Sequence, residues 1–578
     1  MPFSVSRMLF KKSSELTHSV PMKPEVNFSE RFQPHWTFYL SRKEISLMTK
    51  TIHTAKAARD FDSYSISQLG IPSLVLMEHA AQGICTQILK HFPDSDFIAV
   101  YCGPGNNGAD GLALCRLLAL AGKHPVFLID PDARLSEDEK IQLRCCRALG
   151  IPEKPLDFYK DVKDLEKDFD LIADALFGSG LNRPLSDTYA DLALMISESS
   201  LPVVSVDIPS GINGNTGKGE PCVKADLTLA LDCMKTGHLL NEGKKAAGEI
   251  EAINIGIPEW LHEEDPEKIL LIDKDLAAKG LPIRSDLLNK GRFGKILMTG
   301  GSLNMQGALS MAAKSCFHSG IGTLTLFAPE SAAKAVASKM DLAMIIPSAE
   351  IQGYFDVSAA GPLEMLLEKY TFASCGNGMG TGKGAMAITQ TMLESEIGLV
   401  LDADGLNCAS RHPEWLKRKA PLVLTPHLVE FSRISGFLLS DIEQDPIGCI
   451  RRFMETYPDL VLVLKSDVTF VADRTRLAIL NHPSSALSKG GSGDVLCGLV
   501  CGLCAQSDDL FSSCCSAVWI HNHAADVCLQ DDERINPACF TPLDLIKGYS
   551  PLFNELEKHQ KKGKRQTKGS VILNQKNP

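Results

Sequence analysis

Several features that would place this chain in a specialised class are missing from its 578 residues. No uncharged apolar run reaches the roughly 18 residues that a membrane-spanning helix needs. The N-terminal segment lacks the long apolar core and small-residue cleavage site of a secretion signal. The 18 cysteines show no disulfide-framework spacing and occur within apolar runs. We therefore expect a reduced, cytoplasmic protein that has no membrane partner.

An excess of positive charge is also missing. The chain has 59 Lys and Arg against 70 Asp and Glu, a net charge of -11. A nucleic-acid-binding surface requires the opposite balance, so we expect no nucleic-acid partner. The hydrophobic content of 44% is ordinary for globular proteins. Because the chain is too long for one hydrophobic core, we expect more than one domain.

Short apolar runs that alternate with helical patterns fill most of the chain. Runs such as FIAVYC and LPVVSVDIPSG, and later KILMTGG and IGLVLDADGLN, are typical of buried parallel strands. The pattern indicates two α/β domains, separated by the charged stretch PEWLHEEDPEKILLIDKD. We expect an N-terminal extension at 1–50, a first domain at 51–265, a second at 275–555 and a basic, disordered tail at 556–578.

Three cysteines in the second half have the spacing C-x3-C-x2-C, as in some iron–sulfur enzymes. Cys497, Cys501 and Cys504 lie in GDVLCGLVCGLCAQ, which reads as a helix. Positions i, i+4 and i+7 share one helical face, whereas a cluster needs a loop around the metal. We predict buried packing cysteines here.

The first glycine-rich segment, CGPGNNGADGLALCRLL, has the order strand, turn, helix. Gly103, Gly105 and Gly108 allow close backbone approach, and the helix start offers amides to an anion. This spacing alone also fits a Rossmann dehydrogenase, although no ribose-binding acid follows at the next strand end. The asparagines and Asp110 in this segment are unusual for a loop that binds only phosphate.

Two later strand ends also present oxygen-bearing side chains. Asp174 opens DALFGSGLNRPL, and Asp207 and Ser210 lie in VSVDIPSGINGNTG. Such residues are common in ordinary turns. Together with Asn107, however, they predict an oxygen-only cation site beside a ligand pocket.

The segment LSKGGSGDVLCGLV carries the strongest local signal of the second half. Gly490, Gly491 and Gly493 precede a helix whose first amides can stabilise an anion. Asp494 in its first turn could be a simple helix cap, or a base that deprotonates a hydroxyl beside a phosphoryl group.

The order GPGNNGADG, DALFGSGL, VDIPSGINGNTG and KADLTLAL resembles the NAD(P)HX epimerase domain. This resemblance implies a Rossmann-like three-layer sandwich that interconverts R and S hydrates of NADH and NADPH with K+. It implies Asn107, Asp174 and Ser210 as potassium ligands and Asp207 as the acid or base. The substrate-binding residues implied are Asn106, Asn107, Gly108, Ala109, Asp110, Gly178, Ser179, Gly180, Leu181, Asn182, Arg183, Pro184 and Asp207. Ala109 stands where the family usually has glycine.

The motifs CGNGMG, LVLDADGLN, LTPHLVEF, LVLKSDVT and GGSGDVLCG resemble the ADP- or ATP-dependent NAD(P)HX dehydratase family. This resemblance implies a ribokinase-like three-layer sandwich, with Asp494 as the base that activates the substrate hydroxyl. Phosphate then leaves, and Mg2+ neutralises charge on the nucleotide. The hydrate-binding residues implied are Ala308, Gly378, His427 and Asp494. The nucleotide-binding residues implied are Lys465, Ser466, Asp467, Val468, Thr469 and Gly493.

The second half departs from its family at several positions. These are Asn289, Asn377, Leu428, Val429, Ser466 and Asp467. A carboxylate at Asp467 would repel a nucleotide phosphate if it faced the pocket. We therefore keep open the choice between ADP and ATP, and an altered rate. Two alternatives also remain, namely a small-molecule kinase related to ribokinase and a first domain that only binds or scaffolds. We expect a homo-oligomer.

Overall fold

The computed structural model describes residues 50–282, 293–531 and 536–574. The expected N-terminal extension and the departure at Asn289 lie outside these ranges. Within them, no helix combines the length and apolar character needed to cross a membrane.

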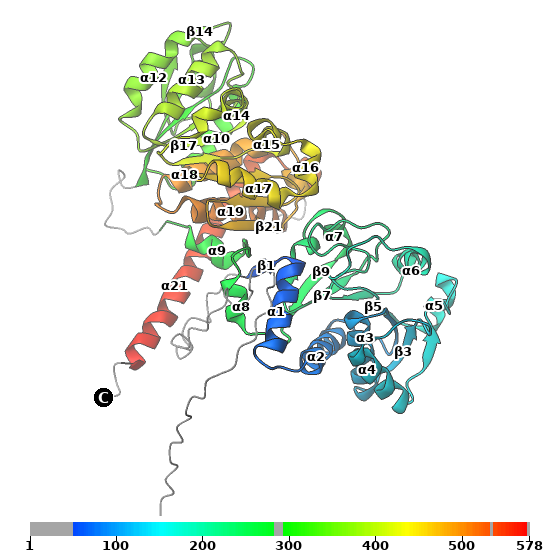
Figure 1. The fold of residues 1–578 in the computed structure, drawn as a ribbon. Helices are drawn as coiled ribbons and strands as arrows, with labels where there is room; N and C mark the ends of the chain where they lie inside the picture. Colours follow the sequence, from blue (N-terminus) through cyan, green and yellow to red (C-terminus); the bar gives the residue numbers. More distant parts are fainter. Residues whose placement is uncertain (1–49, 283–292, 532–535, 575–578) are drawn as a thin grey trace, which may run out of the picture. The chain divides into compact units, whose positions relative to one another are not determined.

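A seven-stranded parallel sheet forms the core of the first half (Figure 1). In spatial order its strands are β4 (Glu153–Pro155), β3 (His124–Ile129), β2 (Phe97–Cys102), β5 (Leu171–Ala175), β6 (Val203–Val206), β7 (Leu227–Leu231) and β9 (Glu249–Ile253). The order reverses between β2 and β5. Because ligand crevices open beside such a reversal, at the carboxyl ends of the strands, the loops after β2 and β5 are where a site is expected.

Helices cover both faces of this sheet. One face packs against α5 (Val162–Asp168) and α6 (Asp187–Glu198), since Tyr101 of β2 shares an apolar cluster with Leu165 and Ile196. The other face packs against α3 (Asn106–Leu120), whose Gly111 lies so close that an added Cβ would come within 2.6 Å of Ala175 Cβ. Beside α3, in the same layer, lie α2 (Ser73–His91) and α4 (Glu137–Ala148). The first half is therefore a three-layer sandwich, as predicted.

The second sheet has twelve strands. Their spatial order is β13 (Met344–Ser348), β12 (Thr323–Pro329), β11 (Lys295–Thr299), β16 (Phe372–Cys375), β17 (Gly398–Leu401), β18 (Leu422–Leu424), β19 (Leu460–Lys465), β20 (Thr469–Ala472), β21 (Leu477–Leu480), β10 (Ile269–Leu271), β1 (Thr51–His53) and β8 (Met234–Lys235). The strands from β13 to β19 are parallel, whereas β20 is antiparallel to both of its neighbours. The order reverses between β11 and β16, so the loops after these strands meet.

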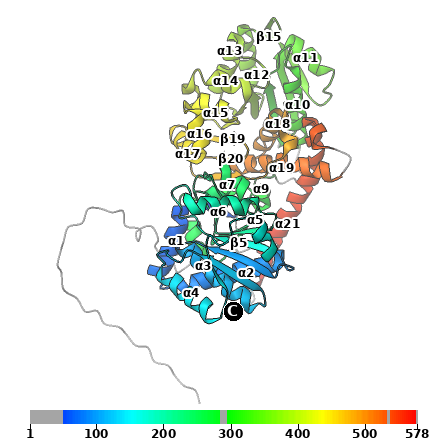
Figure 2. The same ribbon diagram turned by 90° about the vertical axis from the view of Figure 1, so that its right-hand side faces the viewer.

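Adjacent residues of β11 point to opposite faces of the second sheet, and each face has its own helical layer. Ile296 and Met298 join the apolar cluster formed with α10 (Gln306–His318), α18 (Ser492–Cys504) and α19 (Leu510–Asp531). Leu297 joins the cluster formed with α13 (Lys383–Glu394), α14 (Ala403–Ala409) and α17 (Pro446–Thr456). Figure 2 shows these two layers on either side of β19 and β20. The predicted α/β three-layer architecture is confirmed.

Shorter elements complete both halves. They are α1 (Ala55–Ser67), α7 (Asn241–Ala246), α8 (Glu259–Glu264), α9 (Lys274–Lys279), α11 (Glu330–Ala337), α12 (Ala360–Leu367), α15 (Leu428–Ser435), α16 (Leu439–Gln444), α20 (Pro542–Leu545) and the hairpin β14 (Glu350–Ile351) with β15 (Tyr354–Phe355). The three cysteines Cys497, Cys501 and Cys504 are buried and free on α18, as predicted for packing residues.

The expectation of a disordered C-terminal tail is wrong for most of that segment. Helix α21 (Tyr549–Asn574) continues through the basic sequence. Its first turns are anchored by the buried side chains of Leu552 and Leu556, and Gln560 donates to the backbone carbonyls of Ala278 and Leu281. Lysine and glutamine are good helix formers, so a helix that is anchored in this way extends through them.

Candidate active sites

The first glycine loop joins β2 to α3, and its glycines are required by close backbone contacts at Gly103 and Gly108 and by a positive φ at Gly105. Gly105 precedes the helix with φ of 110°. A Cβ at Gly108 would come within 1.7 Å of the Gly103 carbonyl oxygen. No residue with a side chain fits at Gly108. This close approach places the side chains of Asn106, Asn107 and Asp110 at the carboxyl end of β2.

A cavity of about 490 Å³ opens above this loop. The predicted substrate-binding residues that line it are Asn106, Asn107, Asp110, Gly178, Ser179, Gly180, Leu181, Asn182 and Asp207. Gly108, Ala109, Arg183 and Pro184 do not line it. Ala109 is fully buried and packs in a cluster with Met77 and Ala81. The extra methyl group at this position therefore faces α2 and leaves the cavity unchanged.

Asp207 forms a buried ion pair that sequence analysis missed. Lys235 Nζ donates to Asp207 Oδ1 over 2.6 Å, and Asp207 Oδ2 accepts from the amide of Ser179 over 2.8 Å. These contacts outweigh burial and lower the pKa of Asp207 to about 2. The sequence did contain a signal for this pair, because Lys235 directly follows the apolar run LTLALDCM. A lysine at the end of a buried strand needs a partner of opposite charge.

His238 links the two members of this ion pair through their backbones. Its Nδ1 accepts from the amide of Lys235 over 2.9 Å, and its Nε2 lies 2.7 Å from the carbonyl oxygen of Asp207. Since Nδ1 is an acceptor, the ring proton must be on Nε2. Burial and the charge of Lys235 lower the pKa of His238 to about 4, so this imidazole stays neutral.

Other carboxylates face the same cavity. Asp62, Asp110 and Asp232 line it together with Asp207. Burial, and then the charges of Asp207 and Asp62, raise the pKa of Asp110 well above its usual value. The cavity therefore combines a carboxylate whose pKa is lowered, Asp207, with a carboxyl group whose pKa is raised, Asp110. Such a pairing is typical of sites that move protons.

The three predicted potassium ligands surround the start of the loop after β5. Ser210 Oγ donates to Asp174 Oδ1 over 2.6 Å and accepts from the amide of Phe177. Asn107 Oδ1 lies against Gly178, and Asn107 Nδ2 is buried without a hydrogen-bond partner. Asp174 is completely buried, and no Lys or Arg within the described ranges pairs with it. Burial consequently raises its pKa. An uncompensated buried carboxylate with hydroxyl and amide groups beside it fits a monovalent cation.

The second site is organised around Asp494, in the first turn of α18. Asn377 Nδ2 donates to Asp494 Oδ1 over 2.8 Å and to Asp402 Oδ2 over 3.1 Å. Both partners are carboxylates, so the NH2 end of the amide must face them. Cys497 Sγ contributes a third contact, to Asn377 Oδ1. Asn377, which departs from the family pattern, therefore joins the predicted base to a second carboxylate.

The pKa of Asp494 is raised to about 6, mainly because the side chain is buried. The negative charges of Asp402 and Asp404 raise it further, whereas Asn377 and Lys465 lower it. Lys465 Nζ lies 3.0 Å from Asp402 Oδ1, and Thr425 Oγ1 donates to the same oxygen. The sequence motif LVLDADGLN contained Asp402, but nothing in it indicated that this carboxylate would meet Asp494.

The other predicted residues of the second half converge on the same strand ends. A Cβ at Gly378 would lie 3.1 Å from Ala308 Cβ, so the loops after β11 and β16 touch. His427 caps α15, where its Nδ1 accepts from the amide of Val429. Its backbone also forms an isolated parallel β-bridge with Lys465. Gly493 lies next to Lys465 Nζ.

The predicted nucleotide segment from Lys465 to Thr469 is the tight turn between β19 and β20. Lys465 and Thr469 pair across it. Val468 is buried in the core, so only its backbone can contact a ligand. The side chain of Asp467 is 69% exposed.

The glycine turn before α18 has a supporting partner that sequence analysis did not identify. Gly491 adopts φ of 102°, which starts the helix abruptly. Ser492, in the same turn, shares a hydrogen bond of 3.1 Å with His521 Nε2. His521 is buried, and burial lowers its pKa to about 3, so it is neutral. One of the turn's amides, that of Ser492, already donates to the carbonyl of Lys489.

Comparison with known proteins matches each half to a separate family model. Residues 73–237 match the family described as YjeF-related protein N-terminus. Residues 296–544 match the family described as NAD(P)H-hydrate dehydratase. The second match contains the site around Asp494, and the first contains the ion pair of Asp207 and Lys235 but neither Asp62 nor His238.

Solved structures match parts of the chain at low sequence identity. An ADP/ATP-dependent NAD(P)H-hydrate dehydratase from Bacillus subtilis, co-crystallised with ATP and Mg2+, is 22% identical, with a TM-score of 0.44, and covers 50% of this chain and 99% of its own. A yeast protein is 25% identical, with a TM-score of 0.31, and covers 32% of this chain and 82% of its own.

Full-length relatives contain both halves in the same order. A bifunctional NAD(P)H-hydrate repair enzyme from Coxiella burnetii is 31% identical, over 79% of this chain and 91% of its own. One from Thermosynechococcus vestitus is 33% identical, over 83% of this chain and 93% of its own. This identity extends over nearly the whole length of both relatives. The chain belongs to the family of bifunctional NAD(P)H-hydrate repair enzymes.

Proposed function

We propose that this chain repairs hydrated NADH and NADPH, with the first half epimerising the R and S hydrates and the second half dehydrating the S form. The observation that supports this most directly is that two separate sites exist in one chain. Each lies at a strand-order reversal of its own sheet, and each contains the residues that its family motif implies.

For epimerisation, we assign different roles to two carboxyl groups. Inverting the carbon that bears the hydroxyl requires a bond at that carbon to break and form again on the other face. The raised pKa of Asp110 favours its protonated form, which can give a proton to the departing oxygen. Asp207 has a pKa of about 2, which makes it a weak base. Its permanent negative charge instead stabilises positive charge that develops on the ring.

Potassium fits the oxygen groups of Asn107, Asp174 and Ser210. When bound, the ion would supply positive charge next to the substrate loop. The residues themselves order the loop, since Asp174 accepts from the amides of Leu176 and Ser210 and Ser210 accepts from that of Phe177. These contacts hold the segment from Phe177 to Ser179 against the cavity, where the amide of Ser179 donates to Asp207.

For dehydration, Asp494 removes the proton from the substrate hydroxyl, which attacks the terminal phosphoryl group of an adenine nucleotide, ADP or ATP. Phosphate then leaves more easily than hydroxide. A base with a pKa of about 6 is ionised at neutral pH. The amides at the start of α18 face the developing charge, and Lys465 beside Gly493 adds a positive group. Mg2+ would enter with the nucleotide and neutralise its phosphates.

The test follows reduced-nicotinamide absorbance from a mixed R and S hydrate preparation with ADP or ATP, Mg2+ and K+. We expect complete recovery by the wild-type chain. Asp494→Asn should abolish recovery, because epimerisation alone produces no NADH. Asp207→Asn should stop recovery at the S fraction of the mixture.

Failure to recover either epimer with either nucleotide would refute the dehydratase assignment. A stable phosphorylated product without NADH would instead indicate a small-molecule kinase.

A further inference from the structure

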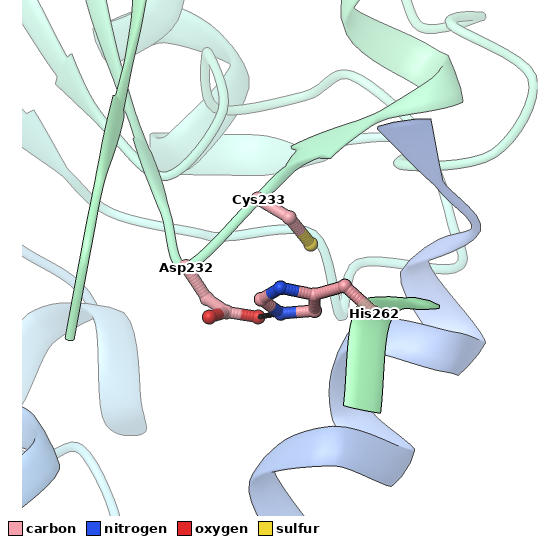
Figure 3. Close-up of side chains that lie close together, drawn as sticks. All are labelled: Asp232, Cys233 and His262. Carbon is pink, nitrogen blue, oxygen red and sulfur yellow. Dashed lines mark hydrogen bonds and ion pairs between the residues drawn. The ribbon is translucent and has the colours of Figure 1, made fainter. Parts of the chain in front are cut away.

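Three side chains with metal-binding groups lie close together (Figure 3), and one of them, Asp232, lines the first cavity. They are Asp232 and Cys233, between β7 and β8, and His262 on α8. One ligand atom from each lies within 4.8 Å of the other two. We propose that these three residues form a binding site for a zinc(II) ion. This site is separate from the oxygen-only potassium site and does not depend on either proposed activity.

The backbone at Asp232 turns two consecutive side chains to the same side. Neighbours in an extended strand normally point to opposite faces. Asp232 instead has φ of 65°, and the amide of Cys233 donates to the carbonyl of Leu231 over 2.8 Å. This tight γ-turn, which is rare for residues with a side chain, directs both Asp232 and Cys233 toward the ring of His262.

The spacing of the ligand atoms is close to that of a tetrahedral zinc site. Zinc binds sulfur at about 2.3 Å and nitrogen or oxygen at about 2.0–2.2 Å, so its ligand atoms lie roughly 3.3–3.7 Å apart. His262 Nε2 and Asp232 Oδ2 are 2.8 Å apart. Since all three ligand atoms lie within 4.8 Å of one another, small side-chain movements bring them to this spacing.

The ring of His262 is held in place by its neighbours. Phe61 packs edge-on at 5.0 Å between ring centroids, and His53 lies at 5.3 Å. His53 is itself fixed by a 2.7 Å contact with Asp265. Positioned rings of this kind lower the cost of ordering a metal ligand. Asp232 also lines the cavity, so an ion can enter from there and keep one coordination position open to solvent.

Without metal, His262 Nε2 donates to Asp232 Oδ2 over 2.8 Å, and the thiol of Cys233 lies beside these two groups. Zinc would replace the hydrogen between His262 and Asp232 and the hydrogen of the thiol. The thiol proton passes to solvent as the zinc–sulfur bond forms, and the His262 proton moves to Nδ1 through solvent. One thiolate and one carboxylate then balance the charge of the ion. Thiolate and imidazole ligands favour zinc over Mg2+ or K+.

The experiment titrates the metal-free, full-length chain with Co2+, which reports zinc sites by colour, and then displaces it with Zn2+. We expect one Co2+ per chain, with a thiolate-to-cobalt charge-transfer band and tetrahedral visible bands. Zn2+ should displace the Co2+ and so remove both the charge-transfer band and the visible bands. Cys233→Ser should lose the charge-transfer band, and His262→Asn should weaken Co2+ binding at least tenfold, in line with the loss of one metal ligand.

Cys222→Ser is the matched control, because this cysteine is in the same half of the chain but outside the cluster. It should bind Co2+ as the wild type does. Thermal unfolding in the presence of a chelator confirms that each variant is folded. Absence of saturable Co2+ and Zn2+ binding by the wild type would overturn the proposal. So would a charge-transfer band that persists in Cys233→Ser.

Discussion

Asn377 donates a hydrogen bond of 2.8 Å to Asp494, the proposed base of the second site, and the same NH2 group reaches Asp402. Asn377 is 1% exposed, and Cys497 fixes the opposite end of its amide. The asparagine therefore separates two carboxylates with a pair of donors. The proline of the family's usual Gly-Pro-Gly pattern has no side-chain donor and could not do this.

Replacing Asn377 with alanine should raise the pKa of Asp494, because the ionised carboxylate loses a donor while Asp402 remains near it. Loss of one such hydrogen bond is expected to shift the pKa by about one unit. The pH profile of kcat/KM for dehydration measures this shift. Its acid limb should move upward from about 6.

Thr425→Val is the control for Asn377→Ala. It removes a hydrogen bond to Asp402 but no contact with Asp494. Its acid limb should stay close to that of the wild type. An unchanged limb in Asn377→Ala, with normal folding, would contradict the positioning role of Asn377.

The wild-type dehydratase should lose activity as pH falls through about 6. The pKa of Asp494 is raised by burial and by Asp402 and Asp404, and lowered by Asn377 and Lys465. The base must be ionised to act, so the rate should fall about tenfold per pH unit well below this value. Asp494→Asn should reduce kcat by about 10²–10⁴-fold above this pKa and should remove the acid limb of the pH profile. Single-turnover kinetics with the S hydrate would measure both effects.

Replacing Lys235 with methionine should destabilise the first half, because Asp207 would remain as an unpaired buried carboxylate. Breaking a buried ion pair in this way costs about 3–5 kcal/mol. Urea unfolding at pH 7 measures this loss. The double variant Lys235→Asp with Asp207→Lys exchanges the two residues, and its stability tests whether charge pairing alone restores the free energy of unfolding.

The pH dependence of this stability has a defined sign. Asp207 has a folded pKa of about 2, below the unfolded value of about 3.9. Its contribution is complete above about pH 4 and disappears as pH falls toward 2. Stability of Lys235→Met should therefore change less than that of the wild type across this window. An equal acid dependence in both proteins would contradict the low pKa of Asp207.

Asp110→Asn should slow epimerisation more than it affects hydrate binding. Asp110 is a carboxyl group of the cavity whose pKa burial raises, and its asparagine variant cannot release a proton. A general acid contributes about 10²–10⁴-fold to the rate. In the wild type, the epimerisation rate should fall as pH rises through the raised pKa of Asp110. Interconversion of a purified R hydrate without nucleotide measures the rate, and equilibrium dialysis measures binding.

We expect removal of K+ to slow the same interconversion, because the proposed ion would compensate the charge of the buried Asp174. A large cation that cannot enter, such as tetramethylammonium, keeps the ionic strength constant. Asp174→Asn should make the rate independent of K+. Equal rates with both cations would contradict a potassium requirement.

The architecture could be predicted from the sequence because its signals are local. Apolar runs such as FIAVYC become buried strands, and GPGNNGADG and GGSGDVLCG begin helices where expected. The role of the glycines could also be predicted, because a tight turn before a helix requires residues without a side chain, and Gly108 has no space for one. The basic tail was misjudged because its helix depends on contacts of Leu552, Leu556 and Gln560 with distant parts of the chain.

The sequence by itself determined the two α/β halves and the residues at their strand ends, because patterning and glycine turns act over a few positions. Only the tertiary structure decided which of these residues meet. Asp207 and Lys235 are 28 positions apart, and Asn377 and Asp494 are 117 apart. Their distances, and hence the pKa values of the two carboxylates, depend on how strands and loops pack. The packing sets the burial of each carboxylate and the charges next to it, and no local sequence pattern encodes either of them.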